Sequence, residues 1–254
     1  MVTGLVRFRE HFEDFSDRYL IIGGTACELA LTEAGLPFRA TRDIDIVLCL
    51  EAVDVAFARA FWDFVQSGRY ESLEAPGDRR HFYRFRKPRT DGYPAMLELF
   101  SRMPELLGDD FRGHLIPIPI SDEVSSLSAI LLDPDYEGWA RAGRTMIQAL
   151  PLVRPEHLIP LKARAWLDLT RRSAEGQPVD RKDIRKHRND VFRLYAVIDP
   201  EYHVQPPASI RADMTRFIEA MHRESIDLKA MGLRGMQLES VLDALSMRFG
   251  VAPS

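Results

Sequence analysis

The spacing of apolar residues along the first half of the chain predicts helices and strands in alternation. Apolar residues recur at helical intervals in three segments, whereas short apolar or alternating runs are typical of strands. The predicted helices are 5–17, 25–34 and 51–67, and the predicted strands are YLII before Gly23, then 43–50, 81–88 and 93–102. The segment LIPIPI at 115–120 is expected to be extended, because its two prolines exclude a regular helix.

The second half of the chain has a mainly helical pattern. Four helices are predicted at 155–172, 180–196, 206–223 and 236–248, while 145–153 fits either a strand or an extended connection. The fold class is therefore α/β (α+β): a mixed sheet with helices on one face in residues 1–120, and a mainly helical part in 121–254. We expect the two parts to form opposite walls of a cleft, with the strands at 19–22, 43–50 and 94–100 as sheet neighbours.

Composition narrows the class of protein but not its function. The 254 residues are 46% hydrophobic and 28% charged, which excludes a mostly disordered chain. The net charge of −4 means that any nucleic-acid binding has to come from local basic patches. Two cysteines are too few for a disulfide framework, and neither a signal peptide nor a membrane-spanning run is visible. These features indicate a cytoplasmic protein with reduced cysteines and no membrane partner.

The first candidate site is the glycine turn at Gly23, Gly24 and Thr25, where a predicted strand gives way to a helix. Glycines allow a phosphate to approach the backbone closely, and the amides at a helix N-terminus favour an anion. Thr25 adds a hydroxyl donor. Alone the turn is a weak signal, because many strand–helix turns contain glycines simply to change direction.

Three acidic residues form the second candidate site. Asp43 and Asp45 stand at i and i+2 of a predicted strand, so they share one face. Two adjacent carboxylates repel unless a cation neutralises them, and carboxylate oxygens suit Mg²⁺. For this pair alone, an exposed pair at a strand end is the simpler interpretation. Glu98 lies between Leu97 and Leu99, and its local pattern fits a solvated sheet face as well as a site.

This combination resembles the DNA polymerase beta-like nucleotidyltransferase superfamily, and within it the AbiEii-type nucleotidyltransferase toxins. The resemblance spans roughly residues 20–195. It differs in a longer gap between Gly24 and Asp43 and in threonine where many members have serine. The residues that carry it are Gly23, Gly24, Thr25, Arg39, Thr41, Asp43, Asp45, Glu98, Lys162 in LIPLKARAWL and Asp183 in DRKDIRKH.

The resemblance implies an enzyme that binds a nucleoside triphosphate (NTP) with Mg²⁺ or Mn²⁺ and transfers the nucleoside monophosphate to an acceptor. In such chemistry two ions lie about 3.5–4 Å apart and stabilise the entering and leaving oxygens, which requires converging carboxylates. Asp43 and Asp45 would hold both ions. Glu98 would bind one of them or act as the base for the acceptor hydroxyl.

Lys162 and Asp183 are the candidate site residues of the helical part. Lys162 shares a helix face with Leu158 and Trp166, so it either extends its ammonium to water or reaches a buried anion. The resemblance favours a triphosphate contact, with Asp183 orienting Lys162 or a nearby arginine. Two basic segments, 79–89 and 181–188, fit phosphate binding, although solvated surface is the simpler interpretation of such runs.

Three functions remain open from the sequence. The first is a nucleotidyltransferase acting on RNA or protein, as the toxin of a toxin–antitoxin pair with a cognate antitoxin as partner. The second is a non-catalytic nucleotide- or RNA-binding protein on the same fold. The third is a transferase for a small antibiotic acceptor, although the basic segments fit a phosphate-rich acceptor better than a cationic drug.

Overall fold

The structure is a computed structural model that describes residues 3–38, 43–48, 55–72, 82–100, 130–131, 133–203 and 205–251. For 43–48, 72, 82–83 and 100 it describes the backbone alone. The helices are α1 (Leu5–His11), α2 (Gly23–Glu33), α3 (Val55–Gly68), α5 (Pro134–Ala142), α6 (Pro155–Ala174), α7 (Arg181–Tyr195), α8 (Ala208–Met221) and α9 (Leu238–Phe249), with 3-10 turns at Glu13–Phe15 and Lys229–Met231. The strands are β1 (Tyr19–Ile22), β2 (Asp43–Leu48), β3 (Glu71–Ser72), β4 (Phe82–Arg86), β5 (Met96–Phe100), β6 (Arg144–Ile147) and β7 (Leu150–Val153).

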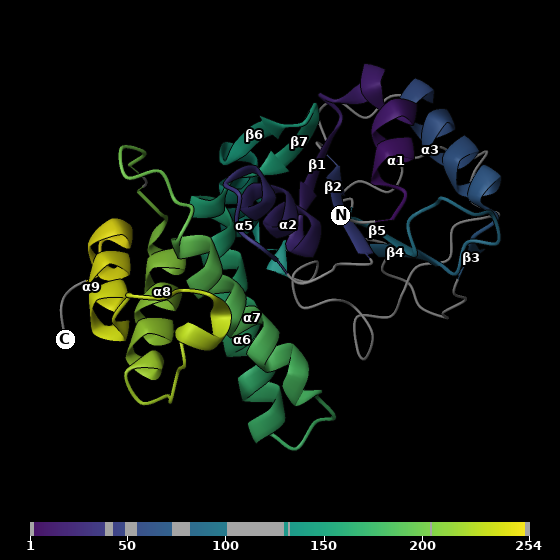
Figure 1. Ribbon diagram of the computed structural model, residues 1–254. Helices are drawn as coiled ribbons and strands as arrows, with labels where there is room; N and C mark the ends of the chain where they lie inside the picture. The colour runs from purple at the N-terminus through teal and green to yellow at the C-terminus, as the bar shows by residue number, and fades with distance from the viewer. Residues whose placement is uncertain are drawn as a thin grey trace.

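The strands form one mixed sheet in the order β3-β4-β5-β2-β1-β7-β6 (Figure 1). β2 lies between β1, to which it is antiparallel, and β5, to which it is parallel. The expectation that these three strands are neighbours is therefore confirmed. The segment 145–153, for which two interpretations were open, forms the hairpin β6–β7, and β7 pairs in parallel with β1. The mixed α/β fold class is confirmed as well.

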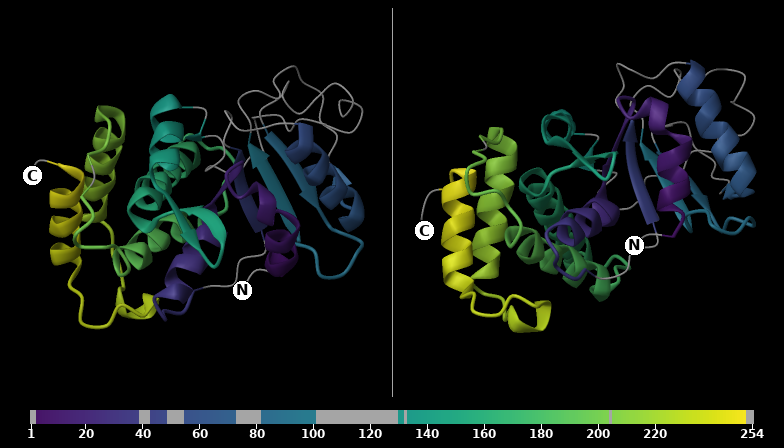
Figure 2. Two further views of the ribbon diagram at one scale, coloured as in Figure 1. Left: turned by 90° about the horizontal axis from the view of Figure 1, so that it is seen from above. Right: turned by 45° about the horizontal axis from the view of Figure 1, so that its top comes forward.

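One face of the sheet is covered by α1 and α3, which Figures 1 and 2 show on the same side. Their aromatic side chains build a buried cluster: Phe8 meets Tyr19 of β1 edge to face, and Phe61 packs against Phe85 of β4. The alternation along each strand puts Leu97 and Leu99 of β5 on this same face, and both are buried. On β4 and β5 the opposite face carries Arg84 and Glu98, which are directly paired.

The helices after β7 make up the rest of the molecule. α6 packs along α7, and both contact α2, which follows β1 directly. α8 packs on α6, and α9 packs on α8 at the end of the molecule far from β3 and β4 (Figures 1 and 2). α2, α6 and α7 therefore connect the sheet to the C-terminal helices. No helix among the described ranges is long and apolar enough to cross a membrane.

Several predicted elements differ from the observed ones at their ends. The first helix stops at His11, and a 3-10 turn at Glu13–Phe15 replaces its expected continuation to residue 17. α2 begins at Gly23 and not at residue 25. Pro160 lies inside α6 as its sixth residue, and its missing amide removes one helical hydrogen bond, to the carbonyl of Glu156. The segment LIPIPI lies outside the described residues.

Candidate active site

The candidate site is built on one row of residues that crosses four strands. Ile22 of β1 is paired with position 45 of β2, position 45 with Glu98 of β5, and Glu98 with Arg84 of β4. Directly paired residues lie on the same face of a sheet, so the row runs along the face opposite α1 and α3. The structure thus brings positions 45 and 98 together, as the sequence predicted. Position 43, two residues earlier on β2, is paired with Met96 and shares this face.

The glycine turn stands at one end of this row. β1 ends at Ile22 and α2 begins at the next residue, so the chain turns without a loop. Gly23 has φ of +75°, in the left-handed region that side chains with a Cβ rarely adopt, which explains glycine at this position. The first turn of α2 contains no acidic residue to neutralise its amides. The start of α2 is therefore an electropositive backbone site next to position 45.

Glu98 is buried, with 6% of its surface exposed, and Arg84 is its counter-ion. The Nε of Arg84 donates to Glu98 Oε1 at 2.7 Å, and Nη2 contacts the same oxygen. Both side chains are largely withdrawn from water, so the pair is much less screened than a surface ion pair. Of the two interpretations left open for Glu98, the solvated sheet face does not describe it.

In the basic segment 79–89, Phe85 packs inward and is 3% exposed. It lies against Phe61 and Trp62 of α3. The arginines of this segment have a different place, because Arg84 and Arg86 alternate with Phe85 and so share the face of Glu98. Sequence reasoning did not identify Arg84 as a site residue. Its spacing from Phe85 gives its face but not its partner on the next strand.

Lys162 is fully buried in α6, so its ammonium does not extend to water. Its Nζ lies 3.2 Å from Oδ2 of Asp190 in α7, which is also fully buried. Arg193 Nη1 approaches the other oxygen, Oδ1, at 3.7 Å. The pair is thus an internal connection between two helices that both pack on α2.

Of the two roles expected of Asp183, orienting Lys162 or a nearby arginine, the first belongs to Asp190, which forms the ion pair with Lys162. Asp183 is exposed in the first turn of α7, whereas Asp190 stands seven residues later on the buried side of the helix. The physical reason is amphipathicity: Asp183 is surrounded by charged residues, whereas Asp190 precedes the buried Val191 and Phe192. The signal that could have identified Asp190 from the sequence is its helical spacing, because it stands next to Val191 and four residues before Leu194 on the apolar side of the predicted helix.

The structure describes some of the remaining residues of the sequence motif and not others. Gly23, Gly24 and Thr25 are buried at the start of α2, and Thr25 has no exposed surface. Arg39 and Thr41 lie outside the described residues, and the side chains of Asp43 and Asp45 are not described. In the described part of the chain, no group of three or more His, Cys, Asp or Glu side chains could hold a metal ion. Carboxylates at positions 43 and 45 would have to complete such a group with Glu98.

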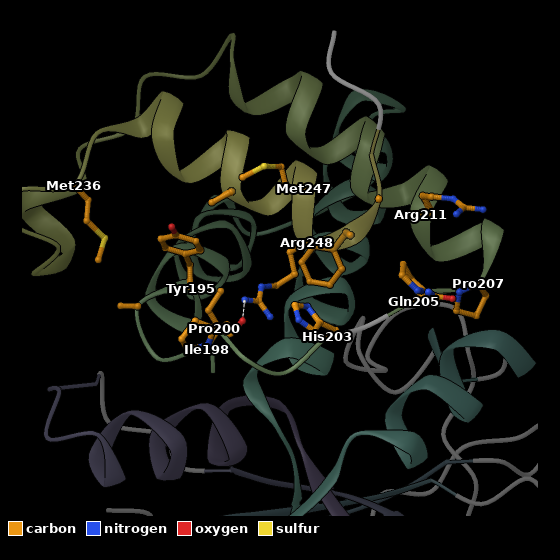
Figure 3. A pocket seen from close by; sticks show the side chains of 15 residues that line it. Tyr195, Ile198, Pro200, His203, Gln205, Pro207, Arg211, Met236, Met247 and Arg248 are labelled. Atoms are coloured by element: carbon orange, nitrogen blue, oxygen red, sulfur yellow. Dashed lines mark hydrogen bonds between the residues drawn. The ribbon is translucent and has the colours of Figure 1, made fainter.

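A separate pocket lies among the C-terminal helices. It has a volume of about 1270 Å³, and Figure 3 shows side chains from α8, α9 and the segment after α7 around it. Arg248 is one of its lining residues and donates to the carbonyl oxygens of Tyr202 at 2.6 Å and Pro200 at 3.4 Å. None of its lining residues belongs to the sheet or to α2, so it is separate from the row of Glu98.

No family model and no curated protein matches the sequence. Among solved structures, an antigenic nucleotidyltransferase-like protein from Paracoccidioides brasiliensis is similar at 17% identity, with 98% of this chain and 94% of that chain covered and a TM-score of 0.48. JHP933 from Helicobacter pylori is similar at 13% identity (96% and 87% covered, TM-score 0.41). The antibiotic-resistance factor ANT(2'')-Ia is similar at 14% identity (88% and 100% covered, TM-score 0.36). Identities and TM-scores this low do not establish a family or an activity for the chain.

Proposed function

We propose that the chain is a metal-dependent nucleotidyltransferase, which transfers a nucleoside monophosphate from an NTP to an acceptor and releases pyrophosphate. The observation that carries the proposal is the parallel register between β2 and β5, which pairs position 45 with Glu98. Asp43 stands two residues away on the same strand, and the amides of α2 begin beside the row. The sequence motif supports the same assignment, since it resembles that of the superfamily at these positions.

A divalent ion fits this donor set. Carboxylate oxygens are hard ligands that suit Mg²⁺ or Mn²⁺, and acids at positions 43, 45 and 98 share one face. When bound, the metal supplies charge neutralisation for the phosphate oxygens and lowers the pKa of the acceptor hydroxyl. Arg84 fixes the orientation of Glu98 by contacting Oε1. Asp43 and Asp45 would be the metal ligands in this proposal, together with Glu98.

The triphosphate would lie against the start of α2. Gly23 and Gly24 have no side chain to keep a phosphate from the backbone, and amides at a helix N-terminus attract an anion. Lys162 is the candidate cation from the helical part, and Asp190 holds its ammonium in place. A contact between Lys162 and the triphosphate would couple the α6–α7 pair to substrate binding through α2. Asp183 has no part in this assignment.

The test is transfer of label from the α-phosphate of each of the four NTPs, with Mg²⁺, to a pool of RNA and protein acceptors. Asp45→Asn should abolish labelling, because it removes a charged metal ligand. Glu71→Gln is the matched control, since Glu71 is a half-exposed acid on β3 of the same sheet and pairs with the exposed Lys87 and Arg89. Absence of label with every NTP, or equal labelling by the Asp45→Asn variant, would refute the proposal.

The acceptor proposed here is RNA or protein, in the setting of a toxin paired with an antitoxin. Induced expression in bacteria should then arrest growth, and Asp45→Asn should relieve the arrest at equal protein level. The experiment distinguishes the toxin role from the enzyme activity. Transfer in vitro without growth arrest would support the nucleotidyltransferase activity and exclude the toxin role.

A further inference from the structure

A groove of about 670 Å³ lies between the C-terminal half of α6 and the N-terminal half of α7. Thr170 and Ser173 line it from α6, and Arg181, Arg185 and Arg188 line it from α7. The three arginines stand at i, i+4 and i+7, which places them on one side of the helix. At a rise of 1.5 Å per residue they extend over about 10 Å. The groove contains none of the residues of the proposed active site.

The charges of this groove are not balanced within the described chain. Glu224 also lines the groove, and its Oε2 accepts a hydrogen bond from Nη1 of Arg188 at 2.8 Å. Arg181 and Arg185 are exposed, and neither forms an ion pair with a residue that the structure describes. Two guanidinium groups one helical turn apart are therefore available to an external anion.

The position of these cations in α7 is electrostatically unfavourable. Residues 181–188 contain five Lys or Arg and one acid, and they form the first two turns of the helix. The N-terminus of a helix already carries partial positive charge, so basic residues there are normally avoided. Asp180 caps the helix through the amide of Lys182, which offsets part of this charge. A bound anion would offset the remainder.

We propose that this groove binds the phosphodiester backbone of a single-stranded nucleic acid. Guanidinium groups bind phosphate oxygens through paired hydrogen bonds, and hydroxyls such as that of the exposed Ser173 are common additional donors to phosphates and sugars. A row of cations along about 10 Å matches a ligand whose charges repeat along a strand. The groove recognises the backbone and not the base sequence, because its cations lie along the helix and Trp166, its aromatic residue, is buried.

The experiment measures binding of a fluorescein-labelled dodecauridylate to the full chain without NTP or metal, over a range of salt concentrations. The test variant is Arg181→Gln/Arg185→Gln. The matched control is Lys182→Gln/Lys186→Gln, which removes the same charge from the same turns of α7 but from residues that do not line the groove. Circular dichroism and thermal denaturation of each variant establish that the fold is retained.

Each phosphate contact contributes about 0.7 to the slope of log K against log salt for a single strand. Loss of two contacts should reduce the slope by about 1.4, which corresponds to roughly tenfold weaker binding at 0.15 M salt. The lysine control should keep both slope and affinity. Equal losses in the two double variants would show a diffuse charge effect and overturn the proposal, as would no loss in either.

Two competitors test the class of ligand. Unlabelled dodecauridylate should displace the probe, whereas a dodecaglutamate peptide and inorganic phosphate at equal charge should not. Displacement by the peptide with the same dependence on Arg181 and Arg185 would assign the groove to an acidic protein instead. The result is independent of the proposed enzyme activity, because the Asp45→Asn variant should bind the oligonucleotide as tightly as the wild-type chain.

Discussion

Replacing Lys162 by methionine should lower the free energy of unfolding by about 3 kcal/mol. Lys162 Nζ and Asp190 Oδ2 are 3.2 Å apart and neither side chain is exposed, so the substitution removes one partner of a buried ion pair. Removing one partner typically costs about 3–5 kcal/mol, since the other charge stays out of water. Arg193 still approaches Asp190 at 3.7 Å, which places the expected cost at the lower end of this range.

The assay is urea denaturation followed by circular dichroism and by tryptophan fluorescence. Lys182→Met serves as the control, because it removes an exposed lysine from α7 and should change stability by less than about 0.5 kcal/mol. The double variant Lys162→Met/Asp190→Leu should be more stable than Lys162→Met, since a buried pair replaced by apolar groups leaves no isolated charge. A cost below about 1 kcal/mol for Lys162→Met, or strict additivity in the double variant, would refute this reasoning.

Three further predictions concern the sheet and the C-terminal helices. Arg84→Met should lower the free energy of unfolding by about 1.5–3 kcal/mol, because Glu98 loses a charge-assisted hydrogen bond. Mg²⁺ should raise the melting temperature of this variant more than that of the wild type. Equal shifts in the two proteins would contradict a metal at Glu98. Burial lowers the pKa of His157 in the folded protein. As the pH falls below about 6.5, the histidine is therefore protonated in the unfolded chain before it is protonated in the folded one, and the free energy of unfolding decreases. The fall in melting temperature between pH 7.5 and 5.5 should accordingly be smaller for His157→Gln than for the wild type. Gly23→Ala should cost about 1–2 kcal/mol because of its positive φ, whereas Gly138→Ala, in a helix with open space around it, should be neutral or stabilising in the same denaturation assay.

The central strands were predictable because their patterns are simple. A wholly apolar run before Gly23 and an alternating run at 43–48 define β1 and β2, and the acids on β2 and β5 led to the expectation that these strands are neighbours. The register itself was not predictable. A shift of one residue between β2 and β5 would move Glu98 to the other face, and nothing local specifies the shift.

Prediction from the sequence did not succeed for residues whose partners lie far away along the chain. Arg84 is one of six basic residues in its segment, and only the pairing of β4 with β5 singles it out. Lys162 was ambiguous for the same reason, because an amphipathic helix does not reveal whether a lysine at its apolar edge is covered by another helix. Asp190 of that covering helix decides between the two interpretations.

The parallel pairing of β1 with β7 has a consequence for how the chain acquires its structure during synthesis. β1 is among the first strands to leave the ribosome, yet one of its edges is completed only after residues 150–153 have been made. Until then this edge presents unpaired amides and carbonyls, the kind of surface on which nascent chains associate with one another. A fragment ending near residue 120 would keep that edge permanently. We therefore expect such a fragment to depend on chaperones or to aggregate, and the N-terminal strands to reach their native state only together with the hairpin that follows them.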